Sequence, residues 1–441
     1  MSGIVKDVIQ KAKGGIDYSK YGLDYNPFPS AGVAPDTVNI DTLRRYLGKY
    51  MCEKVREDEV RELAKRLVQT GYVEHSPGHT WIWGDWRVGK STLLMKVYLE
   101  LRDNLQDVIV IYSPKPRHGI VRSTLYYFLR GYEPEFYEEL SSRILVRLVT
   151  ENPVVLKDKW VDEWKETMED LKTKSTEEGK RSLLNRIKDS TLDVFSLVQD
   201  EDAVDTNRLR SMATARFAKE RMTQQVISIF TNAELKADER YAAILDLEKE
   251  KNLERLSDNL VALLQACLYG GYKHVFVFLD DVEDVMRLWT RTKQRTELDI
   301  LSSFLDRMFN DMSMVGTMHA ELFTMFSAGP LQRFVGRAAA DPLNFALVRI
   351  NPLELPDLFD TVTYLLSKAT KGTPPYPLYP FKEEVLKDLH TRLGGKIGMI
   401  LPSLYHLLRM GAESGEYPEI DLSFYEKCQG ELSTELSEGQ S

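Results

Sequence analysis

The sequence predicts an α/β protein, built on a parallel sheet with a large helical insertion and a C-terminal helical lid. Short apolar runs alternate with stretches of helical periodicity, which is typical of parallel strands buried on both faces. About 160 residues separate the second run from the third, whereas a crossover between parallel strands needs about a dozen or more, so this gap predicts the insertion. The five runs are Thr80–Trp83, Val108–Tyr112, Val275–Leu279, Leu322–Phe326 and Ala346–Ile350.

The composition is that of an ordinary soluble globular protein. The 441 residues are 43% hydrophobic and 28% charged, and this length allows two or three domains. There is no apolar run long enough to span a membrane and no signal peptide, so we expect a cytoplasmic protein without a membrane partner. The three cysteines form no C-x-x-C pair, which argues against a disulfide framework or a zinc site. The formal net charge of −9 neither requires nor excludes DNA, which a local basic patch or an oligomer's pore would have to hold.

The predicted sheet is preceded by an N-terminal loop and a helical lead-in over residues 1–79. The segment Tyr21–Pro29 (YGLDYNPFP) is rich in aromatic residues, Gly and Pro, and we interpret it as an ordered loop. Apolar residues then recur every three or four positions from Val38–Gln69, which predicts helices. The sheet domain itself is predicted in two parts, over residues 80–130 and 263–355.

Residues 131–262 form the predicted helical insertion. Tyr132–Asn207 is rich in charged residues with apolar residues at helical spacing, so it is either a solvated helical subdomain or an arm that binds a protein partner. The stripe of apolar residues in Leu253–Cys267 has spacings of three and four. Because it covers only about two heptads, it favours a helix packed on its own sheet over a coiled-coil seam.

A helical lid is predicted for residues 356–425. Pro356–Ala369 and Phe381–Met410 are amphipathic, and the turn-rich segment Lys371–Pro380 (KGTPPYPLYP) joins them. Residues 426–441 are predicted as a polar tail, and its last dozen residues are expected to be frayed.

A glycine-rich motif lies between the first predicted strand and a predicted helix at Thr92–Arg102. Gly84–Ser91 (GDWRVGKS) fits the pattern G-x-x-x-x-G-K-[ST] without exception. In such a loop the backbone N–H groups and the helix N-terminus form a concave anion site, Lys90 neutralises the β- and γ-phosphates, and the Ser91 hydroxyl ligates magnesium. The motif therefore predicts a P-loop NTPase core that binds ATP and Mg²⁺. The predicted nucleotide-binding residues are Gly84, Asp85, Trp86, Arg87, Val88, Gly89, Lys90, Ser91 and Thr92.

Two carboxylates follow the third apolar run, at the end of a strand where ligands bind in open α/β sheets. Asp280 is predicted to hold magnesium through its water shell, and Asp281 to orient or deprotonate the attacking water. Acidic residues after an apolar strand are common by themselves. Their occurrence on the same chain as the glycine-rich motif favours the catalytic interpretation.

Further candidate catalytic residues follow the fourth apolar run. Ser327 is placed to contact the γ-phosphate or the lytic water; Thr324 is the second choice, and either hydroxyl could instead cap the strand end. Arg333 and Arg337 lie four residues apart on a predicted short helix, so both project to one side. Such an arginine could reach into the ATP of a neighbouring subunit in a homo- or hetero-oligomer, or form a surface salt bridge.

Together these motifs resemble the AAA+ class of ATPases, and specifically its initiator-type branch of archaeal origin-recognition, transposition and secretion ATPases. The resemblance covers about residues 21–130 and 270–410 and leaves out the insertion. In that family the segment before the core lies near the adenine, which implies base contacts for Tyr25, Pro27 and Phe28. The features that carry the resemblance are Tyr21–Phe28, the loop Gly84–Ser91, the LDDVED stretch Leu279–Asp284 and the lid sequence Tyr379–Lys396.

Three departures from the family stand out. Members usually have Glu where this chain has Asp281, and the shorter carboxylate could slow hydrolysis. The family's lid arginine falls at Gly398 and is missing, although Lys396 could partly replace it. No winged-helix segment of about 80 residues follows the lid in this sequence.

The favoured hypothesis is an ATPase (an ATP phosphohydrolase) that acts as a nucleotide-dependent switch or loader in a DNA-associated process such as replication, transposition or defence, with the insertion binding a protein partner. The alternative is a nucleotide-gated signalling or assembly scaffold that acts on a protein partner with slow or no hydrolysis. Asp281 and the missing lid arginine favour this alternative. A small-molecule kinase is a third, weaker hypothesis, because the lid and the arginine pair argue against it.

Overall fold

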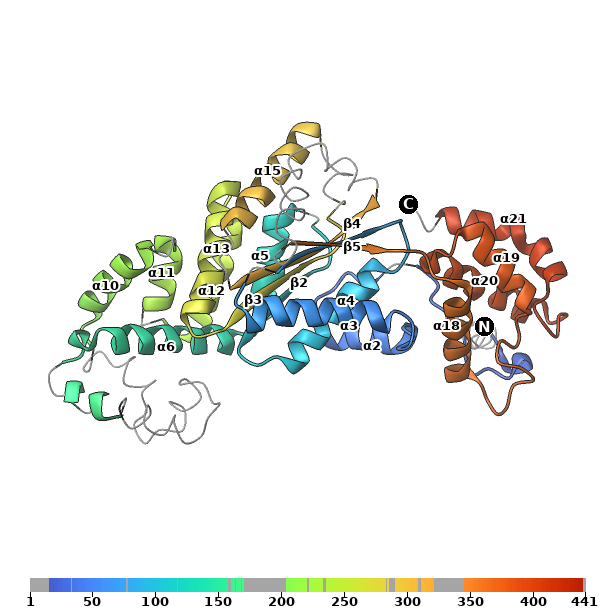
Figure 1. The fold of residues 1–441 in the computed structure, drawn as a ribbon, viewed down its shortest axis with the longest axis horizontal. Helices are drawn as coiled ribbons and strands as arrows, with labels where there is room; N and C mark the ends of the chain where they lie inside the picture. Colours follow the sequence, from blue (N-terminus) through green and yellow to red (C-terminus); the bar gives the residue numbers. More distant parts are fainter. Residues whose placement is uncertain are drawn as a thin grey trace, which may run out of the picture.

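The protein has a central five-stranded parallel sheet with helices on both faces and a helical lid at one end (Figure 1). The strand order is β2-β3-β4-β1-β5, and every pair of neighbours is parallel. The predicted α/β class is therefore confirmed. The computed structural model describes residues 16–32, 34–76, 78–116, 118–157, 160–162, 164–167, 169, 204–219, 222–232, 235–282, 284, 290–307, 311–320 and 345–438.

Four of the five predicted strands are confirmed to within one residue at each end. The predicted strand Leu322–Phe326 lies outside the described residues, and the strand between β3 and β1 comes from Met312–His319 instead. Sequence analysis missed it because Ser313, Gly316 and Thr317 interrupt the apolar run. The strands are β1 (His79–Gly84), β2 (Val108–Ser113), β3 (His274–Leu279), β4 (Met312–His319) and β5 (Phe345–Ile350).

Successive side chains of a strand point to opposite faces of the sheet, so these apolar strands present hydrophobic side chains on both faces. Helices cover both of them. Tyr112 and Phe276 pack with one layer of helices, whereas Ile111 and Val277 pack with the other. The first layer consists of α2 (Ile40–Tyr50), α3 (Glu57–Leu67) with the π-helical turn η2 (Val68–Val73), and α4 (Lys90–Asn104). The second consists of α5 (Ile120–Arg130), α13 (Leu253–Tyr269) and α15 (Arg291–Arg307). The predicted helical lead-in is thus confirmed.

The insertion shares one continuous hydrophobic core with the second face of the sheet. Leu140 and Ile144 are fully buried in the same cluster as Val275 of β3. The boundary predicted after residue 262 falls inside α13, which packs on the sheet as the stripe Leu253–Cys267 predicted. The insertion is therefore part of the core rather than an arm attached to it. Its described helices are α6 (Pro134–Glu151), η3 (Pro153–Val155), α10 (Thr206–Lys219), α11 (Gln224–Thr231), α12 (Ala237–Asp246) and η4 (Leu247–Lys249).

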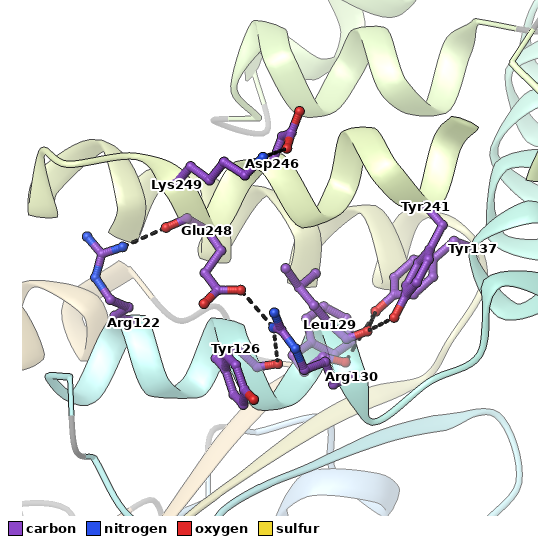
Figure 2. A network of polar contacts seen from close by, with 10 residues as sticks. Arg122, Tyr126, Leu129, Arg130, Tyr137, Tyr241, Asp246, Glu248 and Lys249 are labelled. Atoms are coloured by element: carbon purple, nitrogen blue, oxygen red, sulfur yellow. Dashed lines mark hydrogen bonds and ion pairs between the residues drawn. The ribbon is translucent and has the colours of Figure 1, made fainter. Parts of the chain in front are cut away.

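Arginines of α5 fasten this helix to the insertion (Figure 2). Arg122 donates to the backbone oxygens of Glu248 (2.6 Å) and Glu250 (2.7 Å). Arg130 pairs with the Glu248 carboxylate at 2.7 Å, and its guanidinium lies 3.7 Å from the centre of the Tyr126 ring. Because α5 follows β2 directly, these contacts connect the sheet to the helical insertion.

The side chain of Tyr132 forms hydrogen bonds with the outer edge of β2. The Val110 N–H donates to the Tyr132 hydroxyl at 3.1 Å, and that hydroxyl donates back to Val110 O at 3.2 Å. Unpaired edge groups are a template for pairing with other chains, so this contact protects the edge.

The lid has its own hydrophobic core. Gly394 and Gly395 both have positive φ, 58° and 67°, and they separate α19 from α20 within the predicted stretch Phe381–Met410. The predicted polar tail from residue 426 is helical as far as Glu438. The buried side chains of Phe424, Tyr425 and Cys428 anchor the first part of this helix. The lid helices are α18 (Leu355–Ala369), α19 (Glu383–Leu393), α20 (Ile397–Ser414) and α21 (Leu422–Glu438).

The N-terminal segment belongs to the lid rather than to the sheet. Tyr21 in the short helix η1 (Ser19–Tyr21) and Leu23 are buried in the lid core. The Leu23 bridge to Thr370 and the hydrogen bond from Lys371 N–H to Gly22 O join the segment to the end of α18. In the part of the chain that the structure describes, no helix has the length and apolar character of a membrane span.

Candidate nucleotide site

The candidate site lies at the carboxyl ends of β1 and β3. From β1 the chain passes through α4 to β2 at the far edge of the sheet, whereas β2 leads to β3 and β3 to β4 in the opposite direction. Ligands in open α/β sheets bind in the crevice where the direction of the connections changes. A cavity of about 1290 Å³, including its open mouth, lies there between the glycine-rich loop, the α2–α3 turn and the start of α20.

The glycine-rich loop wraps around the ammonium group of Lys90. Its Nζ donates to Gly84 O at 3.2 Å and to Asp85 O at 2.8 Å, and the residue is only 5% exposed. Gly89 caps α4 with φ of 99°, which favours glycine, and a Cβ on Gly84 would lie 2.3 Å from Ile350 O. The helix α4 then begins at Lys90, so its N-terminal N–H groups face the cavity, and Ser91 and Thr92 line it.

Asp280 gathers the hydroxyl groups of three elements around one buried carboxylate. Its Oδ1 accepts from Ser91 Oγ at 3.0 Å and from Thr317 Oγ1 at 2.6 Å, and its Oδ2 accepts from the Tyr112 hydroxyl at 3.2 Å. The residue is 3% exposed. The serine of the loop and the first carboxylate of β3, predicted from distant parts of the sequence, are thus in direct contact, and their oxygen atoms are the ligand type that magnesium prefers.

Asp281 lies beside this cluster in a left-handed backbone conformation, with φ of 47°. Its N–H donates to Thr317 Oγ1 at 2.9 Å and to Asp280 Oδ1 at 3.0 Å. Burial, and then the negative charges of Asp280 and Asp284, raise the pKa of Asp281 to about 7. A carboxylate with a pKa near neutrality is suited to accept a proton from water.

Arg56 fixes the back of the loop. Its guanidinium donates to Val88 O at 3.0 Å and to Asn351 O at 2.6 Å, and it pairs with Glu59 at 3.0 Å. Arg56 lines the cavity, and burial lowers the pKa of its guanidinium. The side chain thus ties the α2–α3 turn, the loop and the end of β5 together.

The lid contacts the loop through main chain. Gly398 N–H donates to Arg87 O at 2.9 Å, and Arg87 Nη1 donates to Gly398 O at 3.4 Å. A Cβ on Gly398 would lie 2.9 Å from Arg87 Cβ and 3.1 Å from Gly32 O, so any side chain would push the lid away. A side chain as large as arginine therefore does not fit at this position in the present arrangement. Lys396 caps α20 and does not line the cavity, so its position does not support the predicted replacement.

The three aromatic-segment residues predicted to contact the base do not line the cavity. Phe28 is 1% exposed and packs edge-to-face on Phe381 in the lid core, with ring centres 5.7 Å apart. Tyr25 is 41% exposed, its hydroxyl donates to Lys368 O, and Pro27 is buried beside Phe28. The chain reaches the cavity only a few residues after these three. The segment's cavity-lining residues are Pro29, Gly32, Ala34, Pro35 and Asp36.

Ser327, Thr324, Arg333 and Arg337 lie outside the described residues. On the strand between β1 and β3, β4, the structure places the hydroxyl of Thr317 at the carboxylates. The sequence does contain a signal for this residue, because Thr317 is a polar residue near the end of a short run of small and apolar residues.

The site therefore combines a buried ammonium group, the N-terminus of a helix, a hydroxyl and a buried carboxylate in one crevice. These groups fit the phosphates and the magnesium ion of a nucleotide. No protein-family model matches this chain, and a search of curated proteins finds no match to it.

Proposed function

We propose that the protein binds ATP with Mg²⁺ through a P-loop and hydrolyses it slowly, as a nucleotide-dependent switch. The observation that carries the proposal is the 3.0 Å contact between Ser91 Oγ and Asp280 Oδ1, because it joins the glycine-rich loop to the carboxylate of a separate strand. A loop that matched the motif by chance would not be expected to contact a buried carboxylate at the carboxyl edge of the sheet. The closed main-chain contact between Arg87 and Gly398 supports a lid that senses the loop.

Each side chain has a role in this proposal. Lys90 and the N–H groups of α4 bind the phosphates, while Ser91 and Asp280 hold the magnesium. Magnesium, when bound, neutralises charge on the phosphate oxygens. Asp281 orients the attacking water and accepts its proton, and Thr317 holds both aspartates in place through its two hydrogen bonds.

For the use of the ATP, we propose a switch or loader in a DNA-associated process, in the cytoplasm and as part of a homo- or hetero-oligomer. This part rests on the likeness of the motif order to initiator-type AAA+ ATPases. The alternative, a nucleotide-gated scaffold for a protein partner, is favoured by the shared core of insertion and sheet. A change at the end of β2 would reach the insertion directly through α5 and its contacts with Glu248.

The test is steady-state ATP hydrolysis by the full chain with Mg²⁺, with and without duplex DNA, using Lys90→Ala as the blank. Lys65→Ala, an exposed lysine on α3, is the matched control and should retain the wild-type rate. Stimulation of a Lys90-dependent rate by DNA would support the switch or loader. ATP binding with negligible turnover in both conditions would favour the scaffold, and wild-type protein that binds no ATP would refute both.

A further inference from the structure

Among the described residues, four basic side chains line the nucleotide cavity: Arg56, Arg87, Lys90 and Lys115. Three of them have defined partners. Arg56 binds two carbonyl oxygens and Glu59, Arg87 stacks on Trp86 and donates to Gly398 O, and Lys90 donates to the loop. The ammonium of Lys115 makes no hydrogen bond or ion pair with any other residue in the described ranges. Among the described residues that line the cavity, Lys115 is therefore the cation without such a partner.

The backbone holds Lys115 at the acidic end of the cavity. Lys115 follows β2, whose last residue Ser113 accepts the Asp280 N–H at 2.9 Å, so it lies just beyond the point where β2 meets the carboxylates. Pro114 and Pro116 flank it and are buried, whereas Lys115 is partly exposed toward the cavity. Because proline fixes its own φ, this short segment has little freedom to swing the lysine away.

Lys115 lines the same cavity as Asp281, the carboxylate that is proposed to activate water. The attacking water must stand next to the γ-phosphate, so a cation that shares this cavity with Asp281 lies at the γ end of a bound nucleotide. The lid offers no cation for this end, because Gly398 has no room for a side chain and Lys396 lies outside the cavity.

We propose that Lys115 is a second phosphate-binding cation, which contacts the γ-phosphate from the β2 side and makes the site prefer ATP over ADP. This inference rests on the proposed nucleotide function and adds the basis of its selectivity. A charge-assisted hydrogen bond of this kind corresponds to about a 10- to 100-fold change in affinity. That change should fall on nucleotides with a γ-phosphate and spare those without one.

The test is calorimetric titration of the full chain with Mg²⁺ and either the non-hydrolysable ATP analogue AMP-PNP or ADP. Lys115→Ala should weaken AMP-PNP by about 10-fold or more while ADP changes by less than about threefold. Lys115→Arg, which keeps the charge, should recover most of the AMP-PNP affinity. Lys65→Ala is again the matched control, and thermal unfolding of each variant reports whether it is folded.

The outcomes separate this inference from the proposed function. Equal weakening of both nucleotides, or no change in either, would overturn the γ-phosphate role while leaving the nucleotide site intact. Faster hydrolysis by Lys115→Ala with an unchanged preference would show that the lysine restrains Asp281, and would also overturn it. Wild-type protein that binds neither nucleotide would instead refute the nucleotide site itself.

Discussion

The two ends of the same sheet use polar side chains in opposite ways. At the amino end, Ser313 Oγ lies 2.8 Å from His274 Nε2 and accepts the Gly78 N–H at 2.8 Å, while His79 Nδ1 accepts the Met314 N–H at 3.1 Å. All of these groups are buried, and they form hydrogen bonds with one another. At the carboxyl end the polar groups line an open cavity. Polar residues in buried strands therefore mark a ligand site only where the surrounding elements leave space.

Among the variants that compare the two ends of the sheet, Lys90→Ala at the carboxyl end is expected to have the largest effect. Removing the ammonium from the loop should lower ATP turnover by about 100- to 1000-fold, because a preorganised charge facing the transferred phosphate is lost. Lys90 donates to Gly84 O and Asp85 O within the loop, and urea unfolding of the variant checks that the fold is retained. Turnover within about threefold of wild type would remove the carboxyl end from consideration as the catalytic site.

A matched pair on β4 tests the comparison within one strand. Thr317→Val removes the hydroxyl that binds both aspartates and should lower turnover by about 10-fold or more. Ser313→Ala, four residues earlier, should cost about 1 to 3 kcal/mol of unfolding free energy, because Gly78 N–H and His274 lose their partner. It should leave turnover unchanged. If Ser313→Ala slowed hydrolysis as much as Thr317→Val, the two ends would not be functionally distinct.

The lid contact provides a smaller effect. Gly398→Ala places a Cβ 2.9 Å from Arg87 Cβ, so the lid must shift by some tenths of an ångström. We expect ATP to bind about five- to tenfold more weakly, with the sheet still intact, since overpacking costs about 1 to 3 kcal/mol. Equilibrium binding measures this, and Gly48→Ala, where a Cβ meets nothing, is the matched glycine control.

The smallest effect is a pH dependence of stability at the amino end. Burial lowers the pKa of His274 to about 3 from its ordinary value of 6.5, with His75 and His79 adding to the shift. The unfolded chain thus binds a proton that the folded protein excludes, so this contribution is complete above about pH 6.5 and decreases as pH falls toward 3. The slope is at most about 1.4 kcal/mol per pH unit.

Urea unfolding between pH 7 and 5 measures this slope. His274→Gln should remove this contribution, because the titrating ring is gone, while ATP binding at pH 7 stays as in wild type. The raised pKa of Asp281 gives a slope of opposite sign in both proteins, so the difference in slope between wild type and variant measures His274. Equal slopes in the two proteins would assign the pH dependence to other groups.

The sequence could predict a feature of the fold or the site when the residues of that feature are contiguous. The loop at Lys90 and the carboxylates after β3 stand in short continuous patterns, and both predictions place residues at the same crevice. Thr317, Arg56 and Lys115 were missed because each reaches the site only through strand order or the packing of a turn. No local pattern encodes which strand lies between β1 and β3.

The misplaced features have a related cause. Phe28 was assigned to the base because the family pattern gives a neighbourhood but not the direction of a side chain, and its ring packs on Phe381 instead. The predicted boundary between lid and tail fell inside α21, because the apolar anchors Phe424 and Tyr425 stand on the lid side of it and, apart from Cys428, the rest of the helix is mostly polar. In both places tertiary packing against the lid core decided the outcome.

The position of the N-terminal segment in the lid core has a consequence for synthesis on the ribosome. Tyr21, Leu23 and Phe28 are translated early, but the helices that bury them begin about 330 residues later, at Leu355. At about 5 to 20 residues per second, these apolar side chains wait for tens of seconds without their partners. The lid core can therefore assemble only after the strands of the sheet have been translated. A ribosome-bound chain that stops before Leu355 would expose this segment to chaperones.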